Sequence, residues 1–347
     1  MAKTANEVAQ ESLRRHNAKS VMGMTLRNAT GDIDTSTLGY QIAIDTLTYI
    51  KKQITEQKFY QVAPADYVPI SVGDGAFAQA ILTNLTINTS GDFEEGIINQ
   101  GSANDRLAVA DTGISSKTMQ VRNWAKAVGY SVFEIEQALQ ANNWDIIESK
   151  HRARKQNWDL GIQKIAFLGS SNDTNIPGLL SQTVVNTDIT TLTGLISTLS
   201  AADFATFVAA VLGAYQSNCA YTAFPTHFVI PQDDYTGLAT PVSSTYPVVS
   251  KLTYLKDAFD KIVPGGIKIL PTAYGIGSSA VSSTLGHHRY AMYRYDAESI
   301  RMDIPVDFTV TQPNTVNNFQ FQDAAYGQFT GVGVYRALEL LYFDLSS

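Results

Sequence analysis

Apolar positions along the chain switch between a two-residue period and a helical period. From Phe77 the period is two: one strand face carries Phe77, Ile81, Leu85 and Ile87, and the other carries Asn84, Thr86 and Asn88. Polar, turn-rich sequence then runs from Thr89 to Ser116, and a second alternating run returns through Met119 and Val121. Alternation is typical of half-buried strands. The pattern predicts two strands around a long polar excursion, a hairpin that reaches outward to a partner.

A helical period follows the second strand. Ser131 and Glu134 have the spacing of a capping box, in which each side chain bonds to the backbone N–H of the other residue. The pair Asn142-Asn143 ends this short helix. A long helix is expected from Asp145 to about Leu168, with Gly169 as its stop.

The second half of the chain mixes the two periods. A stripe from Phe204 to Tyr215 predicts one helix, and the apolar positions between Leu252 and Ile262 predict another. Residues 227–231 (HFVIP) and 267–270 (IKIL) are short apolar runs typical of buried strands, and strand-like sequence continues beyond Tyr290. Residues 1–39 have no sustained period, which favours an extended arm, and a helical pattern follows at Ile42, Leu47, Ile50 and Ile54. The predicted class is α+β.

Composition limits the possible functions of the 347 residues. Apolar residues make up 44%, enough for a large core, but charged residues only 16%, below the usual quarter. The net charge of −7 lacks the basic excess of a dedicated nucleic-acid binder. We find neither an apolar run long enough to span a membrane nor a signal-peptide pattern, so the protein is expected in the cytoplasm or in a particle that leaves it.

Motifs for catalysis or cofactors are weak. Residues 275–280 match the dinucleotide fingerprint GxGxxA, but Pro271 is expected to break the preceding strand, and Ser282, Ser283 and Gly286 favour a flexible loop. Neighbouring His287 and His288 would point to opposite faces of a strand, which favours a surface pair over a metal site. His16, His151 and His227 have no partner carboxylate at a telling spacing, and Cys219 is expected to be a buried structural thiol. We therefore predict no catalytic, cofactor-binding or metal-binding residue, and no enzyme.

Four stretches, in this order, resemble the major capsid proteins of tailed bacteriophages with the Hong Kong 97-type fold. They are FYQVAPADYVPI at 59–70 followed by Gly73-Asp74-Gly75, KAVGYSVFEIEQA at 126–138, IAFLGSSNDTNIPGLL at 165–180, and GVGVYRALELLYFD at 331–344. Ala337 stands where a proline is common in the family. None of the four is diagnostic alone, but together they cover the chain from Phe59 onward.

The resemblance implies five parts. These are an N-terminal arm (1–58), an extended loop with its flanks (59–128), a peripheral domain with a long spine helix (129–180), an axial domain (181–288) and closing strands of both domains (289–347). It also implies self-assembly into hexamers and pentamers of an icosahedral head around double-stranded DNA, built in the host bacterial cytoplasm. A portal protein is an expected partner, with a scaffold or decoration protein possible; the chain is expected to be uncleaved and its scaffold separate. The alternatives are an encapsulin-type nanocompartment shell and, from another class, a hydrolase with a dispersed site.

Charge suggests how the extended loop holds a neighbour. Residues 71–116 carry a net charge of −5, whereas the spine segment 145–168 carries +2. In the family this loop lies near the adjacent subunit's spine helix. We hypothesise that Glu94 and Glu95 contact Arg154 and Lys155 of a neighbour. One alternative is that Lys150, Arg152, Arg154 and Lys155 form a solvated helix face, which the i, i+4 spacing of Glu148 and Arg152 favours. Another is that this basic cluster contacts the packaged nucleic acid.

The first prediction concerns covalent links in the shell. Some relatives join subunits through a lysine in the extended loop, but residues 71–116 contain no lysine, and the single cysteine cannot form a disulfide mesh. Particles boiled in detergent with reductant should therefore give one band near 37.8 kDa on a denaturing gel. A ladder of multimers would contradict this.

Overall fold

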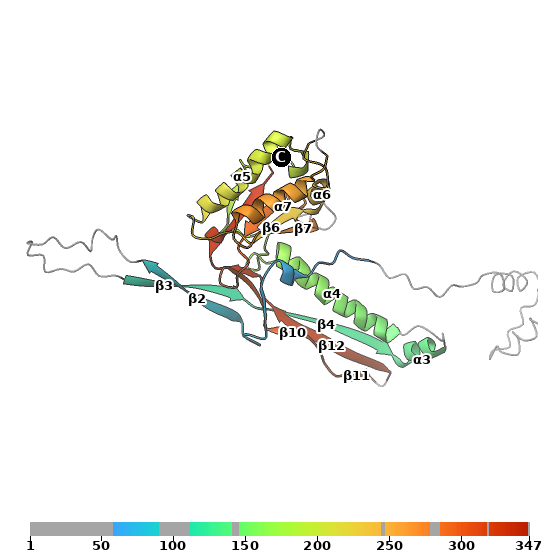
Figure 1. The fold of residues 1–347 in the computed structure, drawn as a ribbon. Helices are drawn as coiled ribbons and strands as arrows, with labels where there is room; N and C mark the ends of the chain where they lie inside the picture. The colour runs from blue at the N-terminus through green and yellow to red at the C-terminus, as the bar shows by residue number, and fades with distance from the viewer. Residues whose placement is uncertain are drawn as a thin grey trace, which may run out of the picture. The chain divides into compact units, whose positions relative to one another are not determined.

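The computed structural model describes residues 58–89, 111–140, 146–243, 247–277, 285–317 and 319–345. The chain divides into two units, Met1–Phe59 and Tyr60–Ser347. The expected arm, apart from Lys58, and the helical pattern from Ile42 to Ile54 lie outside the described residues. All elements named below belong to the second unit and can be followed in Figure 1.

The predicted hairpin is present. Strands β2 (Ala80–Thr89) and β3 (Asp111–Gln120) pair antiparallel over their full length, from Ala80 opposite Gln120 to Thr89 opposite Asp111. Phe77 was expected on this strand, but it precedes the strand and has a φ of 61°. Its N–H donates to Oε1 of Gln328 over 2.7 Å, which fixes the turn into the hairpin. The two strands are thus confirmed, but their bounds differ from the prediction. Phe77 and Val121 lie outside the strands, and β3 begins at Asp111, within the stretch that was predicted to be turn-rich.

The hairpin root is held by one cross-strand pair. Thr83 and Lys117 lie opposite each other. The ammonium group of Lys117 donates to the carbonyl of Val334 over 2.6 Å, and the Thr83 hydroxyl donates to the Tyr335 hydroxyl over 3.4 Å. Burial lowers the pKa of Lys117. Tyr335 also contacts Arg301, whose guanidinium lies 5.4 Å from the centre of the Tyr335 ring. A small set of polar contacts therefore sets the direction of the hairpin.

The two predicted helices follow. In α3 (Val132–Gln140) the capping box is formed: the Glu134 N–H donates to the Ser131 hydroxyl over 3.2 Å, and the Ser131 N–H donates to the Glu134 carboxylate over 3.1 Å. Helix α4 (Ile146–Leu168) ends where Gly169 takes a φ of 73°. A Cβ on Gly169 would lie 2.3 Å from the Ile176 carbonyl, so the returning chain also requires glycine here. Asp145, expected to begin this helix, lies outside the described residues.

Helix α4 packs on a four-stranded sheet. Strand β4 (Arg122–Ser131) pairs antiparallel with β12 (Gln320–Phe329), and β10 (Val306–Val310) and β11 (Asn314–Asn317) pair with successive parts of β12. The rings of Trp124 and Trp158 meet with centroids 5.1 Å apart. A Cβ on Gly327 would lie 2.4 Å from the Trp158 ring, so this glycine lets the helix approach the sheet.

A five-stranded sheet separates two hydrophobic cores. Its order is β5 (Asn186–Asp188), β14 (Leu340–Asp344), β8 (Arg289–Tyr293), β6 (His227–Pro231) and β7 (Lys268–Thr272). Along β6, Val229 faces the first core, whereas Phe228 and Ile230 face the second. The same alternation runs along β8 and β14, so both faces of these strands are buried.

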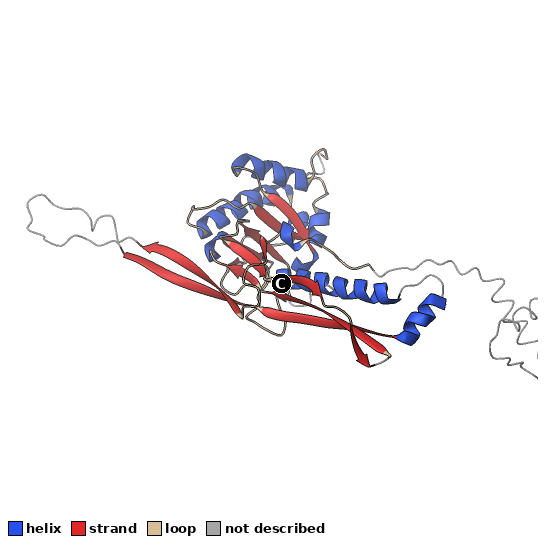
Figure 2. Ribbon diagram, turned by 90° about the horizontal axis from the view of Figure 1, so that it is seen from below, coloured by secondary structure: helices blue, strands red, loops and turns tan. Residues whose placement is uncertain are grey.

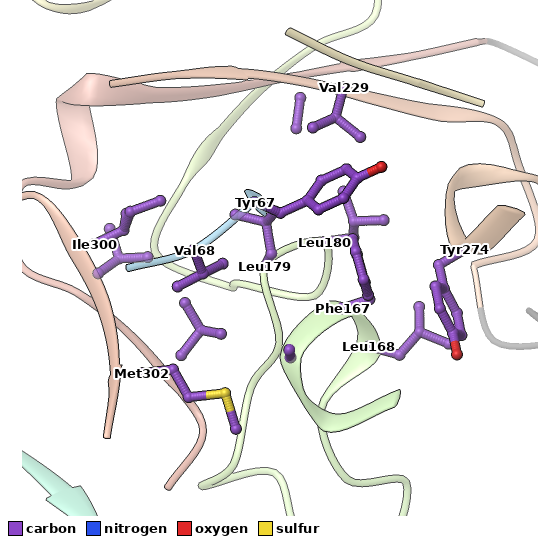
Figure 3. Close-up of a cluster of buried hydrophobic side chains, with 14 of the residues drawn as sticks. Tyr67, Val68, Phe167, Leu168, Leu179, Leu180, Val229, Tyr274, Ile300 and Met302 are labelled. Atoms are coloured by element: carbon purple, nitrogen blue, oxygen red, sulfur yellow. The ribbon is translucent and has the colours of Figure 1, made fainter. Parts of the chain in front are cut away.

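Different elements complete each core. The first contains the C-terminal half of α4 and a three-stranded sheet of β1 (Ile70–Val72), β9 (Ile300–Ile304) and β13 (Val332–Val334). Figure 3 shows part of it, where Tyr67, Phe167 and Leu180 meet from separate segments. The second core is covered by α5 (Ala201–Asn218) and α7 (Lys251–Ile262), with Cys219 buried in it. The remaining described elements are helix α6 (Gln232–Gly237) and the short 3-10 helices η1 (Pro64–Asp66), η3 (Ile196–Thr198), η4 (Ala273–Gly275) and η5 (Ala337–Glu339). Figure 2 shows the helices and strands of the structure in separate colours.

The predicted secondary structure is largely confirmed. The Phe204–Tyr215 stripe is the buried face of α5, and residues 227–231 are β6. The closing stretch 331–344 holds two strands, but they join different sheets: β13 pairs with β9, and β14 pairs with β8 and β5. The class is α+β, as predicted.

The second prediction concerns His227 at the start of β6. Its ring lies between Tyr293 and Tyr295, with centroids 5.6 and 4.7 Å away. Burial, aided by the nearby Lys268 ammonium, lowers the pKa of His227 to about 4. Between the ordinary value near 6.5 and pH 4, the unfolded chain binds a proton that the folded chain refuses, so stability should fall as pH drops through this window.

The size of this effect follows from the pKa difference. Because the ring is only partly buried, we expect a loss of about 1–2 kcal/mol. His227→Phe, which keeps the ring stacking, should flatten the wild-type slope of unfolding free energy between pH 6.5 and 4 in denaturant titrations of the unassembled chain. An unchanged slope would show that His227 is not the titrating group.

Candidate functional site

Two basic residues of α4, Arg154 and Lys155, were predicted to meet a neighbouring subunit, with a solvated helix face as the alternative for the whole basic cluster. Three of the four cluster residues lie at the surface with acidic partners in their own chain. Lys150 lies 3.1 Å from the Glu134 carboxylate and also donates to the carbonyl of Gly129. Arg152 pairs with Glu148 at 3.0 Å, as the i, i+4 spacing predicted, and Lys155 lies 3.7 Å from Asp159. The excess charge of the helix is therefore largely balanced within the subunit.

Arg154 is buried, which differs from its predicted place on a contact surface. Its guanidinium donates to the Asp323 carboxylate over 2.7 Å and to the Asp323 carbonyl over 3.1 Å, with side chains 2% and 1% exposed. Nδ1 of His151 lies 2.9 Å from the same guanidinium. Because burying a charge is costly unless it is paired, this ion pair ties α4 to the middle of β12. Arg154 is thus not accessible to a neighbour's loop in this structure.

Lys155 remains accessible. Its side chain is 61% exposed, and its ammonium lies 5.4 Å from the centre of the Phe308 ring. Glu94 and Glu95, the predicted acidic partners, lie outside the described residues. Of the predicted contact pair Arg154 and Lys155, the structure places only Lys155 where a second subunit can reach it.

Three histidines have carboxylate partners that spacing along the chain did not reveal. His287 pairs with Asp344 at 2.9 Å, His288 with Asp233 at 2.7 Å, and His151 lies 3.5 Å from Asp323. These partners lie far away in the sequence, so no local motif could indicate them. Within the described ranges, no three His, Cys, Asp or Glu side chains are grouped to hold a metal ion. His16 lies outside those ranges.

The GxGxxA match does not form a dinucleotide site in the part that the structure describes. Strand β7 continues through Pro271, so this proline does not break it as predicted; β7 is an edge strand, where a missing N–H costs no ladder bond. The strand leads into η4, a single 3-10 turn. A Cβ on Gly277 would lie 2.4 Å from the backbone of His287, so close packing of two chain segments explains this glycine. Residues 278–284 lie outside the described ranges.

A groove runs beside the C-terminal half of α4. A cavity of about 240 Å³ is lined mainly by apolar groups, including Trp124, Trp158, Ile165 and Phe329, with Gly161, Asn157 and Lys164 also in its wall. A second cavity of about 440 Å³ shares Lys164 and residues 169–171 with it. The groove could not be predicted from the sequence, because its walls come from α4, β4 and β12, which are brought together only by the fold.

The comparisons with known proteins agree with this architecture. A family model described as major capsid protein matches residues 96–345, which is more than two thirds of the chain.

The chain belongs to the major capsid protein family.

Solved structures show the same fold at low identity. The capsid of Myoviridae phage XM1 matches with a TM-score of 0.68 and 16% identity, covering 87% of this chain and 98% of that one. A chain of Gordonia phage Cozz matches with a TM-score of 0.54 and 11% identity over 94% and 99% of the two chains. The capsid of cyanophage P-SCSP1u matches with a TM-score of 0.53 and 11% identity over 88% and 94%. No curated protein sequence matches the chain.

The protein is thus a capsid shell subunit with the Hong Kong 97-type fold, as the resemblance implied. A capsid shell subunit acts through surfaces that meet other subunits. No helix in the described part of this capsid protein has the length and apolar character needed to cross a membrane.

The third prediction tests the buried ion pair. Arg154→Met leaves Asp323 buried without its cation, which should destabilise the subunit by about 3–5 kcal/mol in urea unfolding of the unassembled chain. Arg152→Met is the matched control two residues away. Its exposed pair with Glu148 contributes little, so that loss should stay below about 1 kcal/mol. Equal losses in the two variants would contradict the structural role of Arg154.

Proposed function

We propose that this capsid protein self-assembles into the hexamers and pentamers of an icosahedral bacteriophage head that encloses double-stranded DNA. The observation that carries the proposal is the family match over residues 96–345, together with a fold built around a long β2–β3 hairpin. Among the described strands, β2 and β3 pair only with each other and form a two-stranded sheet of their own. It suits a subunit that overlaps its neighbours in a closed shell.

The surface charge supports a non-specific relation to the DNA. The net charge is −7, and four of the five Lys and Arg residues of α4 have acidic partners in their own chain. Such a subunit does not attract DNA by a basic surface, so the DNA would have to be driven into the shell. We propose a portal protein as the entry point, with a scaffold or decoration protein as further possible partners, and assembly in the host bacterial cytoplasm before the shell becomes part of the virion.

The five parts keep their proposed assignment: residues 1–58 form the arm, 59–128 the extended loop and flanks, 129–180 the peripheral domain with its spine helix α4, 181–288 the axial domain, and 289–347 the closing strands. The two hydrophobic cores support this assignment. The first core contains α4, and the second contains α5 and α7. The closing strands β8 and β14 contribute side chains to both.

Electron microscopy of the purified full-length protein tests the proposed function. Closed icosahedral shells with pentameric vertices are expected, and shells recovered from infected cells should contain nuclease-protected double-stranded DNA. Shells that instead hold an enzyme cargo would support the encapsulin-type alternative. A protein that forms no shell under any condition, alone or with its scaffold, would overturn the proposal.

The contact between subunits is proposed to be partly electrostatic. Residues 90–110 of the extended loop carry Asp92, Glu94, Glu95 and Asp105 against Arg106. Lys155 and Lys164 are exposed lysines of the spine helix. With Arg154 buried, we propose that Glu94 and Glu95 of one subunit approach one of these two lysines on another.

The fourth prediction is a charge-reversal experiment. Changing Glu94 and Glu95 to lysine should lower particle yield at low salt, and reversing the lysine that they contact should restore part of it. Each exposed pair contributes only about 0.2–1 kcal/mol, but every subunit repeats it, and salt screens it. Lys155→Glu and Lys164→Glu are tested separately, with Lys126→Glu on β4 as a control that should not rescue. If the doubly reversed loop assembles like wild type at low salt, the electrostatic contact is wrong.

A further inference from the structure

Gly161 lies in the middle of α4, where glycine weakens a helix relative to alanine. Several other glycines in the described part of the subunit have a visible reason. A Cβ on Gly178 would lie 2.4 Å from the backbone of Gly169, and one on Gly327 would strike Trp158. A Cβ on Gly161 would meet no atom within 4 Å. Nothing in the described part of the subunit therefore requires glycine at this exposed position.

The same residue lines the apolar groove. Trp124, Trp158 and Phe329 supply aromatic surface, and the volume of about 240 Å³ gives room for a single aromatic side chain. Lys164 lies one helical turn from Gly161, is exposed, and makes no ion pair with a described residue. The groove thus combines an aromatic-lined cavity, a stretch of helix backbone without a side chain at Gly161, and the cation of Lys164.

We propose that this groove receives residues 92–98 of a second copy of the chain. Phe93 would fill the aromatic-lined cavity. Glu94 and Glu95 would approach Lys164, and the backbone of the segment would pass over Gly161. The inference rests on the proposed loop contact and deepens it by naming the receiving surface and by selecting Lys164 over Lys155.

The chemistry of the segment favours it as the occupant. Residues 92–98 read Asp-Phe-Glu-Glu-Gly-Ile-Ile, an aromatic side chain flanked by carboxylates, and residues 90–110 carry a net charge of −3. The other long stretch outside the described residues, 1–57, has seven Lys or Arg and six Asp or Glu, a net charge of +1. Only the first complements Lys164 in charge. Lys155, in contrast, already lies near Asp159 and Phe308.

Reach favours a second copy over the same chain. The hairpin is ten residues long, about 33 Å at 3.3 Å per residue. The groove lies near its root, because Arg122, just after β3, pairs with Asp173, which follows the groove residues 169–171. Two residues separate the segment from β2 and twelve separate it from β3. Phe93 lies only four residues beyond Thr89, at most about 14 Å when fully extended. Phe93 therefore cannot return along the hairpin to the groove of its own chain.

Two glycines allow a test that separates folding from assembly. Gly213, in the middle of α5, is also exposed, and a Cβ there would also meet nothing within 4 Å. Gly161→Ala and Gly213→Ala should each raise the melting temperature of the unassembled full-length chain by about 1–3 °C. Gly161→Gln should then lower particle yield about tenfold, whereas Gly213→Gln should not. Equal particle yields for these two glutamine variants would overturn the proposal.

A disulfide test identifies the occupant. Chains carrying Phe93→Cys and chains carrying Gly161→Cys are co-expressed, and the particles are oxidised; the native Cys219 is buried. A disulfide-linked dimer on a non-reducing gel is expected, and Gly213→Cys in place of Gly161→Cys should give none. If no dimer forms while reversal of Glu94 and Glu95 still lowers assembly, the groove is wrong and the electrostatic loop contact stands. If Lys155→Glu rescues and Lys164→Glu does not, the choice of Lys164 is overturned.

Discussion

The burial of both faces of the five-stranded sheet is the constraint on which the rest of the subunit depends. In β6, β8 and β14, successive side chains enter different cores: Tyr342 faces the core that contains α4, and Phe343 faces the core beneath α5 and α7. A shift of one residue in any of these strands would exchange the two sets of side chains. The sheet therefore fixes its own register from both sides. Helix α4 on one side, and α5 and α7 on the other, are positioned relative to this central layer.

A buried ion pair between residues far apart in the sequence also positions helix α4 in the subunit. Arg154 and Asp323 are 169 residues apart, and their buried bond fixes how α4 lies on β12. Carboxylates at the surface balance Lys150, Arg152 and Lys155 of the same helix. This arrangement uses charge to hold the subunit together, and leaves Lys164 as a cation at the edge of an apolar groove. The surface that we assign to assembly therefore has few charged groups and many aromatic groups, as in the centre of many protein interfaces.

Local features of the structure could be predicted from the sequence because they depend on neighbouring residues. The capping box of Ser131 and Glu134, the stop at Gly169 and the buried stripe of α5 are each specified within a few positions. The order of these elements, matched to four short stretches, was enough to indicate the family. The partners of Arg154, His287 and His288 could not be predicted, because they are set by which strands and helices become neighbours. The groove beside Gly161 was missed for the same reason, since a glycine without a contact is informative only when the surrounding space is known.

The hydrogen bond from Lys117 to the Val334 carbonyl holds the hairpin near its root, and the rest of the hairpin extends beyond this point. The root is held by Thr83 and Lys117, whereas the strands continue for several residues beyond them. The six residues beyond Thr83 span about 20 Å, so a rotation of about 5° at the root moves the far end by about 2 Å. Such a rotation changes a hydrogen bond of 2.6 Å by only a small fraction of its length. A curved surface tiled by identical parts needs joints that open and close by a few degrees from place to place, and this geometry supplies that tolerance without repacking either core.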